Sequence, residues 1–360
     1  MSAGGLTTIV GAGIVGAVTA FELARAGLRV RVLEAGPAPA GGVSGRSFGW
    51  VNTLADDAGG DPRRFGLRLA AMERFDALDA LLPEGLPGGR IGGLVWKPDI
   101  ATTETFARKQ AAAGARVTLC DRARVRALAP LLARPPACAV HAADEWALDV
   151  PALCRRLLAS ARAAGAEIGT GIRVRSVEAG PQGGATLTID GDVLTSDHVV
   201  LAAGAATLDL LPGIDLSRDL EISAATLIRL QVDRAPGGPV CQAPSLEWRQ
   251  AGDNTVLVAD GPPESEDEAA LARIAARNRE TLRELMPAAG RVKVSEVLVG
   301  ARPMPVAGRP LVGPLAAAPA ILPAIAHPGV ILAPAIAETL KGVITGRPVD
   351  SGLSADPIAP

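Results

Sequence analysis

The stretch TIVGAGIVGAVTAFELARAGLRVRVLEAG, residues 8–36, decides the fold of this chain. It begins with the end of an apolar run. Gly11, Gly13 and Gly16 then follow in the spacing G-x-G-x-x-G. An amphipathic segment comes next, and a second β-like run ends at Glu34. This order predicts a strand, a glycine turn, a helix and a second strand, which is the context that a dinucleotide-binding turn requires.

Each glycine of the turn has a physical reason. Gly11 permits the tight turn, Gly13 lets the backbone approach a pyrophosphate, and Gly16 lets the helix pack close to the strand. The helix N-terminus then presents free amides and a positive dipole end to the phosphates. Glu34 lies about 20 residues after the turn, where an acidic residue accepts hydrogen bonds from ribose hydroxyls. The turn therefore favours NAD or FAD over NADP, and it does not separate NAD from FAD.

Length and composition predict a folded protein of one large or two modest domains. The chain has 360 residues, of which 48% are hydrophobic and 21% are charged, with a formal net charge of −2. This charge gives no electrostatic reason to expect a nucleic-acid partner.

The cysteines and histidines are scattered, without a C-x-x-C pair or a zinc-like spacing. They are Cys120, Cys138, Cys154, Cys241, His141, His198 and His327. We expect free thiols in a reducing compartment and no metal site. Because the first strand starts almost at the beginning of the chain, we expect no signal peptide and a cytoplasmic location.

The most apolar segment, residues 316–337, is long enough for a membrane span to be considered. Four prolines interrupt it, so we interpret it as core. The remaining pattern predicts helices over 61–82, 103–113, 149–164 and 264–286, a last helix beginning near 330, and antiparallel strands over 220–260. The run VVLAAG, residues 199–204, changes abruptly from β-branched to small residues, as a buried parallel strand does where it ends at a ligand.

Four further pieces make the chain resemble the D-amino acid oxidase family of FAD enzymes, the group that contains glycine oxidase and sarcosine oxidase. They are GGVSGRSFGW, DEWALDVPALCRRLLASARAAGAEI, VVLAAGAAT, and GARPMPVAGRPLVGP followed by HPGVILAPAIAETLKGVITG. The resemblance covers essentially the whole chain in order, and it favours FAD over NAD.

The resemblance implies an α/β fold with two domains. One is a Rossmann-like FAD-binding domain, and the other is a mainly antiparallel β substrate domain of α+β type. The FAD-binding domain would be discontinuous, comprising 1–80, 140–218 and 297–360. The substrate domain would comprise 81–139 and 219–296.

The resemblance also implies a set of FAD contacts. The turn and the second strand would meet the pyrophosphate and the ribose. A second loop would line the flavin, Val174 would hold the adenine through its backbone, and the last helix would point its N-terminus at the flavin pyrimidine. The implied residues are Gly11, Gly13, Ile14, Val15, Gly16, Glu34, Ala35, Gly42, Ser44, Arg46, Ser47, Gly49, Val174, Ala203, Gly204, Gly329, Val330 and Ile331.

The implied reaction is FAD-dependent oxidation of an amino acid or a secondary (imino) amine. A hydride passes from Cα to flavin N5, and the resulting imine hydrolyses. Arg302, in GARP, matches the family arginine that binds the substrate carboxylate. His327 would act as a proton acceptor or a second carboxylate contact. A structural salt bridge and a structural histidine are the alternatives for these two residues. Trp50 and Trp248 would supply apolar walls, although each is more commonly a core residue.

The chain departs from the family in informative ways. It has no tyrosine, whereas many relatives use tyrosine hydroxyls on the substrate. The family's Gly-His pair is replaced by PAIAHPG, and Ala307 stands in place of the usual Asp. We therefore expect a substrate that is bulkier or more apolar than glycine, such as a cyclic secondary amine. No cysteine lies near GARPMP, so we expect non-covalent FAD.

Two other functions fit the same sequence. One is a 2-hydroxy acid dehydrogenase, since Arg302 would serve a hydroxy acid equally well. The other is a flavin-binding subunit of a larger oxidoreductase complex. The sequence leaves open the enantiomer, the oligomeric state, and whether oxygen or a quinone reoxidises the flavin.

Overall fold

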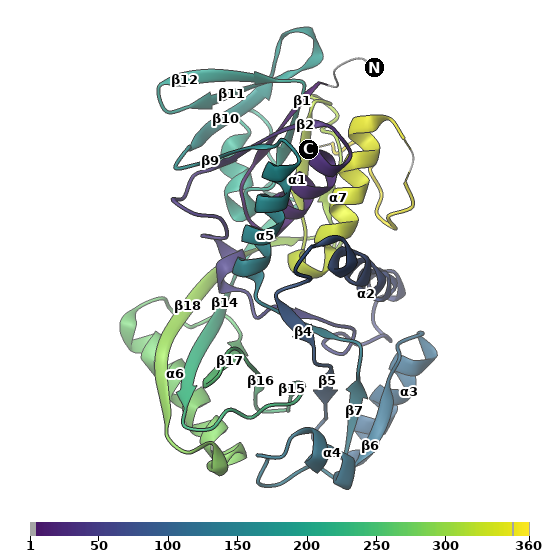
Figure 1. The fold of residues 1–360 in the computed structure, drawn as a ribbon, viewed down its shortest axis with the longest axis vertical. Coiled ribbons are helices and arrows are strands. Elements are labelled where there is room, and N and C mark those ends of the chain that lie inside the picture. The colour runs from purple at the N-terminus through teal and green to yellow at the C-terminus, as the bar shows by residue number, and fades with distance from the viewer. Residues whose placement is uncertain (1–4, 348, 360) are drawn as a thin grey trace.

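A computed structural model describes residues 5–347 and 349–359 (Figure 1). The glycine turn connects two neighbouring strands of a six-stranded sheet in the order β19-β20-β13-β1-β2-β9. All neighbouring pairs are parallel except β19 with β20. The strands are β1 (Leu6–Val10), β2 (Arg29–Glu34), β9 (Glu167–Thr170), β13 (His198–Leu201), β19 (Leu311–Val312) and β20 (Ile321–Ile325).

The central strands of this sheet are buried on both faces, as their continuous apolar runs require. Ile9 belongs to the core on the helix side, and the next residue, Val10, belongs to the core on the opposite side. Helix α1 (Ile14–Arg25) packs against α5 (Val150–Ala163) and α7 (Gly329–Thr345) (Figure 1). The antiparallel sheet of β10 (Val174–Ala179), β11 (Ala185–Ile189) and β12 (Asp192–Ser196) supplies the apolar side chains of the opposite face.

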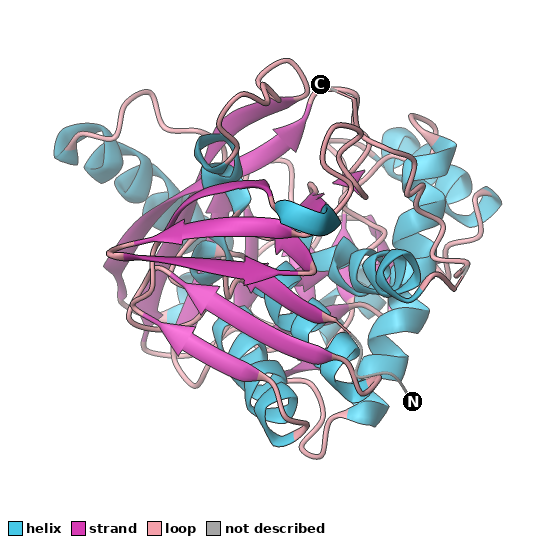
Figure 2. Ribbon diagram, turned by 90° about the horizontal axis from the view of Figure 1, so that it is seen from above, coloured by secondary structure: helices cyan, strands magenta, loops and turns pink. Residues whose placement is uncertain are grey.

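An eight-stranded sheet forms the other half of the molecule, in the order β18-β14-β17-β16-β15-β5-β7-β6 (Figure 1). Figure 2 shows, from above, the strands in magenta with the helices in cyan beside them. Every neighbouring pair is antiparallel except β15 with β5. The strands are β5 (Gly93–Val95), β6 (Thr118–Asp121), β7 (Cys138–Ala142), β14 (Leu220–Val232), β15 (Val240–Gln242), β16 (Glu247–Gln250), β17 (Thr255–Asp260) and β18 (Val292–Pro305).

The helices beside this sheet overlap the predicted ranges but begin at other residues: the helix predicted over 264–286 begins at Glu268, and the helix predicted over 103–113 begins at Ile100. Helix α6 (Glu268–Leu285) packs on β18, and α3 (Ile100–Ala112) and α4 (Arg122–Leu128) pack on β7. Helix α2 (Pro62–Leu81) packs on α7 and connects to the small sheet of β3 (Trp50–Val51), β8 (Trp146–Leu148) and β4 (Gly88–Arg90). Asp61 and Asp149 cap α2 and α5 through their side chains, and a proline lies in the first turn of each helix.

The predicted fold class is confirmed: the chain is a mixed α/β protein with one mainly parallel and one mainly antiparallel sheet. The boundaries that we gave for the two domains stay a prediction. Strand β18 begins before the predicted boundary at 297 and continues past it, and it pairs with β14 along its whole length.

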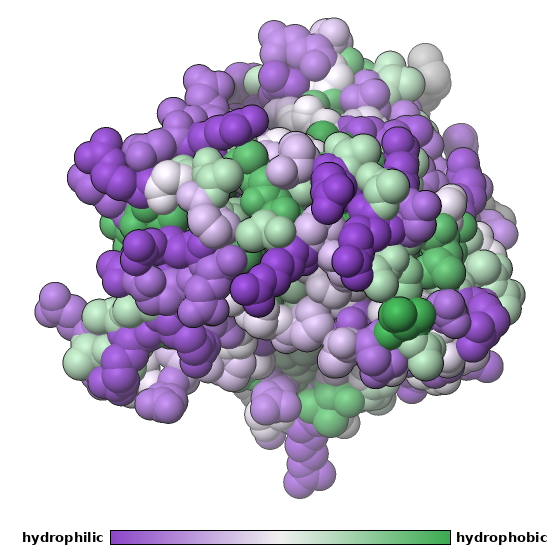
Figure 3. Space-filling model, turned by 90° about the horizontal axis from the view of Figure 1, so that it is seen from below, coloured by the Kyte–Doolittle hydropathy of each residue, from purple (hydrophilic) through white to green (hydrophobic). Residues whose placement is uncertain are grey.

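Most of the apolar segment 316–337 lies in the core, as predicted, because residues 321–325 form β20 and residues 329–337 form the first half of α7, whereas Ala316, Ala317 and Pro319 are exposed. Among the described residues, no helix has the length and the apolar character needed to cross a membrane. The face shown in Figure 3 is mainly hydrophilic, with separate apolar patches between the charged side chains. All four cysteines have free thiols.

Candidate active site

The glycine turn between β1 and α1 leaves no room for side chains. Gly11 has φ +104°, a conformation that L side chains rarely adopt. A Cβ at Gly16 would lie 2.0 Å from the carbonyl oxygen of Gly11, so the helix can approach the strand this closely only with glycine here. The turn therefore has the close backbone packing that the sequence predicts for a dinucleotide site.

The N-terminus of α1 is open to a ligand. Its N-cap residue Gly13 has no side chain to occupy the first amides. The amide of Ile14 donates to Ser44 Oγ at 3.0 Å, while the amides of Val15 and Gly16 have no acceptor within the helix. These two amides and the positive end of the helix are suited to an anionic pyrophosphate.

Glu34 connects the end of β2 to this turn. One carboxylate oxygen accepts from the amide of Ala12 at 2.7 Å, and the other accepts from the amide of Gly36 at 2.8 Å. Each carboxylate oxygen has a further lone pair, so Glu34 keeps acceptor capacity for a hydroxyl beside the turn.

A cavity of about 1070 Å³ extends from the glycine turn, past the 43–49 loop, to the N-terminus of α7 and the antiparallel sheet. This volume is at the upper end of small-molecule sites, as a dinucleotide and a substrate together require. The predicted residues that line it are Gly13, Ile14, Val15, Ser44, Arg46, Ser47, Gly49, Trp50, Gly204, Arg302, His327, Gly329, Val330 and Ile331.

Some of the predicted contacts lie outside this lining: Gly11, Gly16, Glu34, Ala35, Gly42, Val174, Ala203 and Trp248. Gly11 and Gly16 shape the turn from behind. Ala202 lines the cavity where Ala203 was predicted, one residue nearer the end of β13. Val174 begins β10 and is 6% exposed, so its contact with an adenine stays a prediction.

The N-terminus of α7 is a second open helix end in the same cavity. Pro328 is its N-cap and offers no capping side chain, so Gly329, Val330 and Ile331 present free amides at the cavity wall. The positive end of this helix would stabilise negative charge on a group bound here.

Arg302 lies on β18 and reaches across to β14. Its Nη2 donates to Ser223 Oγ at 3.1 Å and to the carbonyl oxygen of Ala224 at 3.0 Å, and its Nε lies 3.5 Å from the carbonyl oxygen of Ser223. Among the described residues, Nη1 has no acceptor and the guanidinium has no carboxylate partner. The alternative of a structural salt bridge therefore has no support in the described part of the chain.

His327 also faces the cavity and is partly buried. Burial, followed by the positive charges of Arg302, Arg68 and Arg64, lowers the pKa of His327 to about 4. The imidazole is therefore neutral near pH 7, with one ring nitrogen able to accept a hydrogen bond.

Of the two tryptophans expected at the cavity wall, Trp50 lies there and Trp248 does not. Trp50 lines the cavity although it is only 5% exposed. Trp248 is 2% exposed and does not line the cavity. Trp96 packs edge-on against it, with ring centroids 5.8 Å apart, and does line the cavity. Trp96 therefore takes the place that the sequence analysis gave to Trp248.

Glu145 is a buried carboxylate that the sequence analysis missed. Its Oε2 accepts from Trp50 Nε1 at 2.8 Å, and its Oε1 accepts from the amides of Thr53 and Leu54 and from Thr53 Oγ1. A Cβ at Gly93 would lie 2.1 Å from Oε2, so only glycine leaves room for this carboxylate. Burial raises the pKa of Glu145 to about 7 despite these hydrogen bonds.

This raised pKa predicts a pH-dependent stability. The folded chain binds the Glu145 proton more tightly than the unfolded chain, so the stabilisation is complete below the unfolded pKa of 4.5 and is lost as pH rises to about 7. Between about pH 5 and about pH 8, the free energy of unfolding should fall by about 3 kcal/mol more in the natural protein than in Glu145→Gln. Urea denaturation at both pH values measures this difference, and equal falls in the two proteins would contradict the assignment.

Arg249 holds the end of the 43–49 loop. Its guanidinium donates to the carbonyl oxygens of Phe48 at 2.6 Å and Leu148 at 2.9 Å. It lies behind Gly49, where a Cβ would be 2.2 Å from the carbonyl oxygen of Leu148. Burial lowers the pKa of Arg249 to about 10, so it stays charged near neutral pH.

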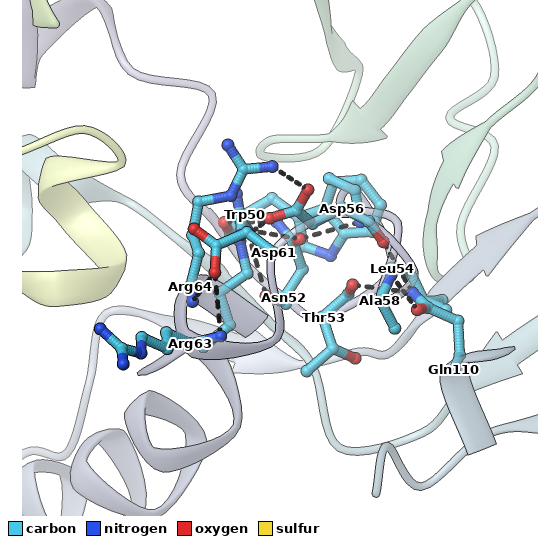
Figure 4. A network of polar contacts seen from close by, with 12 residues as sticks. Trp50, Asn52, Thr53, Leu54, Asp56, Ala58, Asp61, Arg63, Arg64 and Gln110 are labelled. Atoms are coloured by element: carbon cyan, nitrogen blue, oxygen red, sulfur yellow. Dashed lines mark hydrogen bonds and ion pairs between the residues drawn. The ribbon is translucent and has the colours of Figure 1, made fainter. Parts of the chain in front are cut away.

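A polar network anchors the segment that follows Trp50 (Figure 4). Gln110 reaches it from α3 and donates to the carbonyl oxygens of Thr53 and Asp56. From α2, Arg64 and Arg68 share the carboxylate of Asp56, at 2.5 Å and 3.1 Å. Arg68 lines the cavity, whereas Arg64 lies outside it.

Several other cavity residues were not foreseen. Two of them, Arg277 and Asn278, come from α6. The unforeseen polar and aromatic lining residues are Phe48, Asn52, Arg68, Trp96, Lys97, Thr226, Gln242, Ser245, Glu247, Asp260, Arg277 and Asn278. Phe48 lies within GGVSGRSFGW. The others come from distant segments, and no local motif indicated them.

The chain is similar to known proteins along nearly its whole length. The family model described as FAD dependent oxidoreductase matches residues 7–341. The curated protein "Uncharacterized oxidoreductase YurR" of Bacillus subtilis is 24% identical, over 96% of each chain. Iminodiacetate oxidase from Chelativorans sp. has a TM-score of 0.84, with 23% identity over 98% of this chain and 99% of that chain. Glycine oxidase from Geobacillus kaustophilus has a TM-score of 0.83, with 19% identity over 97% of this chain and 96% of that chain.

The residues around the cavity fit FAD. A glycine turn with free amides lies at one end, a second open helix N-terminus lies at the other, and the cavity connects them without interruption. The resemblance to the D-amino acid oxidase group is thereby confirmed, and the chain belongs to the family of FAD-dependent oxidoreductases and is an enzyme of that family.

Proposed function

We propose that this enzyme oxidises an amino acid or an imino acid with non-covalently bound FAD, giving an imine that hydrolyses in water. The observation that carries the proposal is Arg302. Its charge has no carboxylate partner among the described residues, and it faces the same cavity as the two open helix ends. A partly buried cation of this kind is suited to a substrate carboxylate.

The chain would hold FAD through residues of three elements. The amides of Val15 and Gly16 would bind the pyrophosphate, the 43–49 loop would line the flavin, and Gly329 to Ile331 would meet its pyrimidine edge. When bound, FAD accepts the two electrons removed from the substrate. No cysteine is among the residues that line the cavity, which supports a non-covalent cofactor.

Arg302 would orient the substrate by its carboxylate. A planar guanidinium can donate two parallel hydrogen bonds and fixes the direction of the Cα–H bond as well as the affinity. Nη1 is available for this contact, while Nη2 stays anchored to Ser223 and Ala224. Such positioning is a large part of the catalysis that oxidation of an amine needs from the protein.

His327 would accept a proton or a hydrogen bond from the substrate amine, because its lowered pKa keeps the imidazole neutral at working pH. Trp50 and Trp96 would form the apolar wall. Oxygen or a quinone would then reoxidise the reduced FAD.

The test is an anaerobic titration of the purified, FAD-loaded protein with D-, L- and N-substituted amino acids. The expected result is loss of the flavin absorbance near 450 nm with at least one of them, as for any flavin that is reduced. Readmitting air then distinguishes an oxidase, which recovers its absorbance, from a dehydrogenase.

Two outcomes would contradict the proposal. If only a 2-hydroxy acid bleaches the flavin, Arg302 serves a hydroxy acid. If no compound bleaches the flavin and the protein purifies with a second polypeptide, the chain is a flavin-binding subunit.

A further inference from the structure

Arg46, Arg68 and Arg277 line the cavity besides Arg302, and of these three only Arg68 is partly buried, as Arg302 is. Arg68 comes from α2, and its side chain is only 12% exposed. Nε donates to Asp56 at 3.1 Å, and Nη1 donates to Asn52 Oδ1 at 3.2 Å. Among the described residues, Nη2 has no acceptor. Arg68 is therefore held rigidly and keeps one terminal nitrogen free.

The charge of this guanidinium is not cancelled locally. Asp56 is the carboxylate that contacts Arg68, and it is shared with Arg64. The carboxylate of Glu145 also attracts Arg68 but accepts its hydrogen bonds from Trp50, Thr53 and Leu54, so within the described part of the chain Arg64 and Arg68 have a single contacting carboxylate between them. His327 adds no further positive charge near pH 7, because burial and the charges of Arg302, Arg68 and Arg64 lower its pKa.

Two free guanidinium nitrogens in one cavity indicate two anionic groups on the ligand. A monocarboxylate would satisfy Arg302 and leave Arg68 with a partly buried, unpaired donor, which is costly. We propose that the substrate is a dicarboxylic amino or imino acid, with one carboxylate on Arg302 and the other on Arg68. This inference rests on the proposed function. It makes the substrate bulkier than glycine, as the sequence analysis expects, but gives it a charged far end in place of the more apolar or cyclic amine that was also expected there.

Matched achiral probes test the inference directly. Iminodiacetate and sarcosine are both secondary amines, and they differ in having a second carboxymethyl group or a methyl group on nitrogen. We expect kcat/KM to be about 100-fold higher for iminodiacetate, as a charge-assisted hydrogen bond gives. A higher kcat/KM for sarcosine would overturn the inference.

The Arg68→Gln variant tests the residue. It should reduce the preference for iminodiacetate to within about threefold, mainly through KM, while kcat for sarcosine stays within about threefold of the natural enzyme. If Arg68 had a purely structural role, the variant would lower kcat/KM equally for iminodiacetate and sarcosine and leave the preference intact. That result would overturn the assignment. Arg64→Gln is the matched control. It also removes one of the two guanidiniums that pair with Asp56, but the Arg64 side chain does not line the cavity. This variant should retain most of the preference for iminodiacetate.

A binding measurement covers the case in which Arg68→Gln fails to fold. Oxydiacetate and methoxyacetate carry an ether oxygen in place of the amine, so no amine can be oxidised. Oxydiacetate should bind the natural holoenzyme about 100-fold more tightly than methoxyacetate, read from the shift of the flavin spectrum. Equal binding would overturn the inference. If neither dicarboxylic nor monocarboxylic amines bleach the flavin, the proposed function itself fails; if only monocarboxylic amines do, the dicarboxylate inference alone fails.

Discussion

Replacing Arg302 with methionine is expected to lower kcat/KM for the substrate by about 1000-fold, since truncating one partner of a desolvated charge pair costs about 2–5 kcal/mol. Methionine keeps much of the side-chain volume and cannot donate to a carboxylate. Because β18 and β14 pair through their backbones along the whole of β18, the strand pairing should survive the loss of this side chain. Steady-state kinetics on the holoenzyme, with its flavin spectrum recorded, measures the effect.

Two further variants separate substrate binding from a general loss of charge. Arg302→Lys keeps the charge and loses the planar fork, so it should recover only part of the activity. Arg309→Met removes an exposed arginine of the neighbouring turn and should leave kcat/KM within about threefold, as a surface substitution does. An Arg302→Met enzyme with normal kcat/KM would remove the observation on which the proposed function rests.

The elements around the glycine turn could be predicted because their signals are local. The spacing of Gly11, Gly13 and Gly16 and the acidic end of β2 act within one β-α-β unit. The caps Asp61 and Asp149 likewise specify helix starts through contacts a few residues away. Such signals need no knowledge of what the rest of the chain contacts.

The parts of the site that were missed depend on contacts between distant segments. Glu145 meets Trp50 and Thr53 across more than 90 positions, and Arg249 meets Phe48 across 201. Nothing beside Glu145 in the sequence indicates that Gly93 leaves room for its carboxylate. The same is true of Arg68, whose i, i+4 spacing from Arg64 is ordinary for a helix, and whose role follows only from where α2 meets the cavity.

Trp248 was predicted to line the cavity but lies in the core. A tryptophan in a predicted substrate domain suggested an apolar wall, and its strand does border the cavity through Glu247. Successive residues of a strand point to opposite faces, so the neighbour of a cavity residue faces the core. Trp248 pairs with Val258, and both side chains belong to the core of this sheet, while Trp96 lines the cavity.

The second large effect is expected at the glycine turn. Gly16→Ala would place a Cβ 2.0 Å from the carbonyl oxygen of Gly11 and 3.4 Å from the Cβ of Ala202. Backbone cannot yield as a flexible side chain does, so α1 must move away from β1. We expect the free energy of unfolding to fall by about 3 kcal/mol, the upper range for overpacking, although alanine is the better helix former. The displaced amides of Val15 and residue 16 should weaken FAD binding by about 100-fold.

Gly66→Ala is the matched control for this substitution, because both changes add one methyl group to a helical glycine. Gly66 lies in α2, is exposed, and would have nothing within 4 Å of its new Cβ. Alanine has less conformational freedom than glycine in the unfolded chain, so this variant should have a free energy of unfolding that is higher by about 0.5–1 kcal/mol. Its FAD affinity should be unchanged. Denaturant unfolding and flavin fluorescence titration measure both quantities for both variants. If Gly16→Ala were as stable as Gly66→Ala and bound FAD equally well, the close approach of α1 to β1 would not be what holds the pyrophosphate, and the site would have to be built from the 43–49 loop alone.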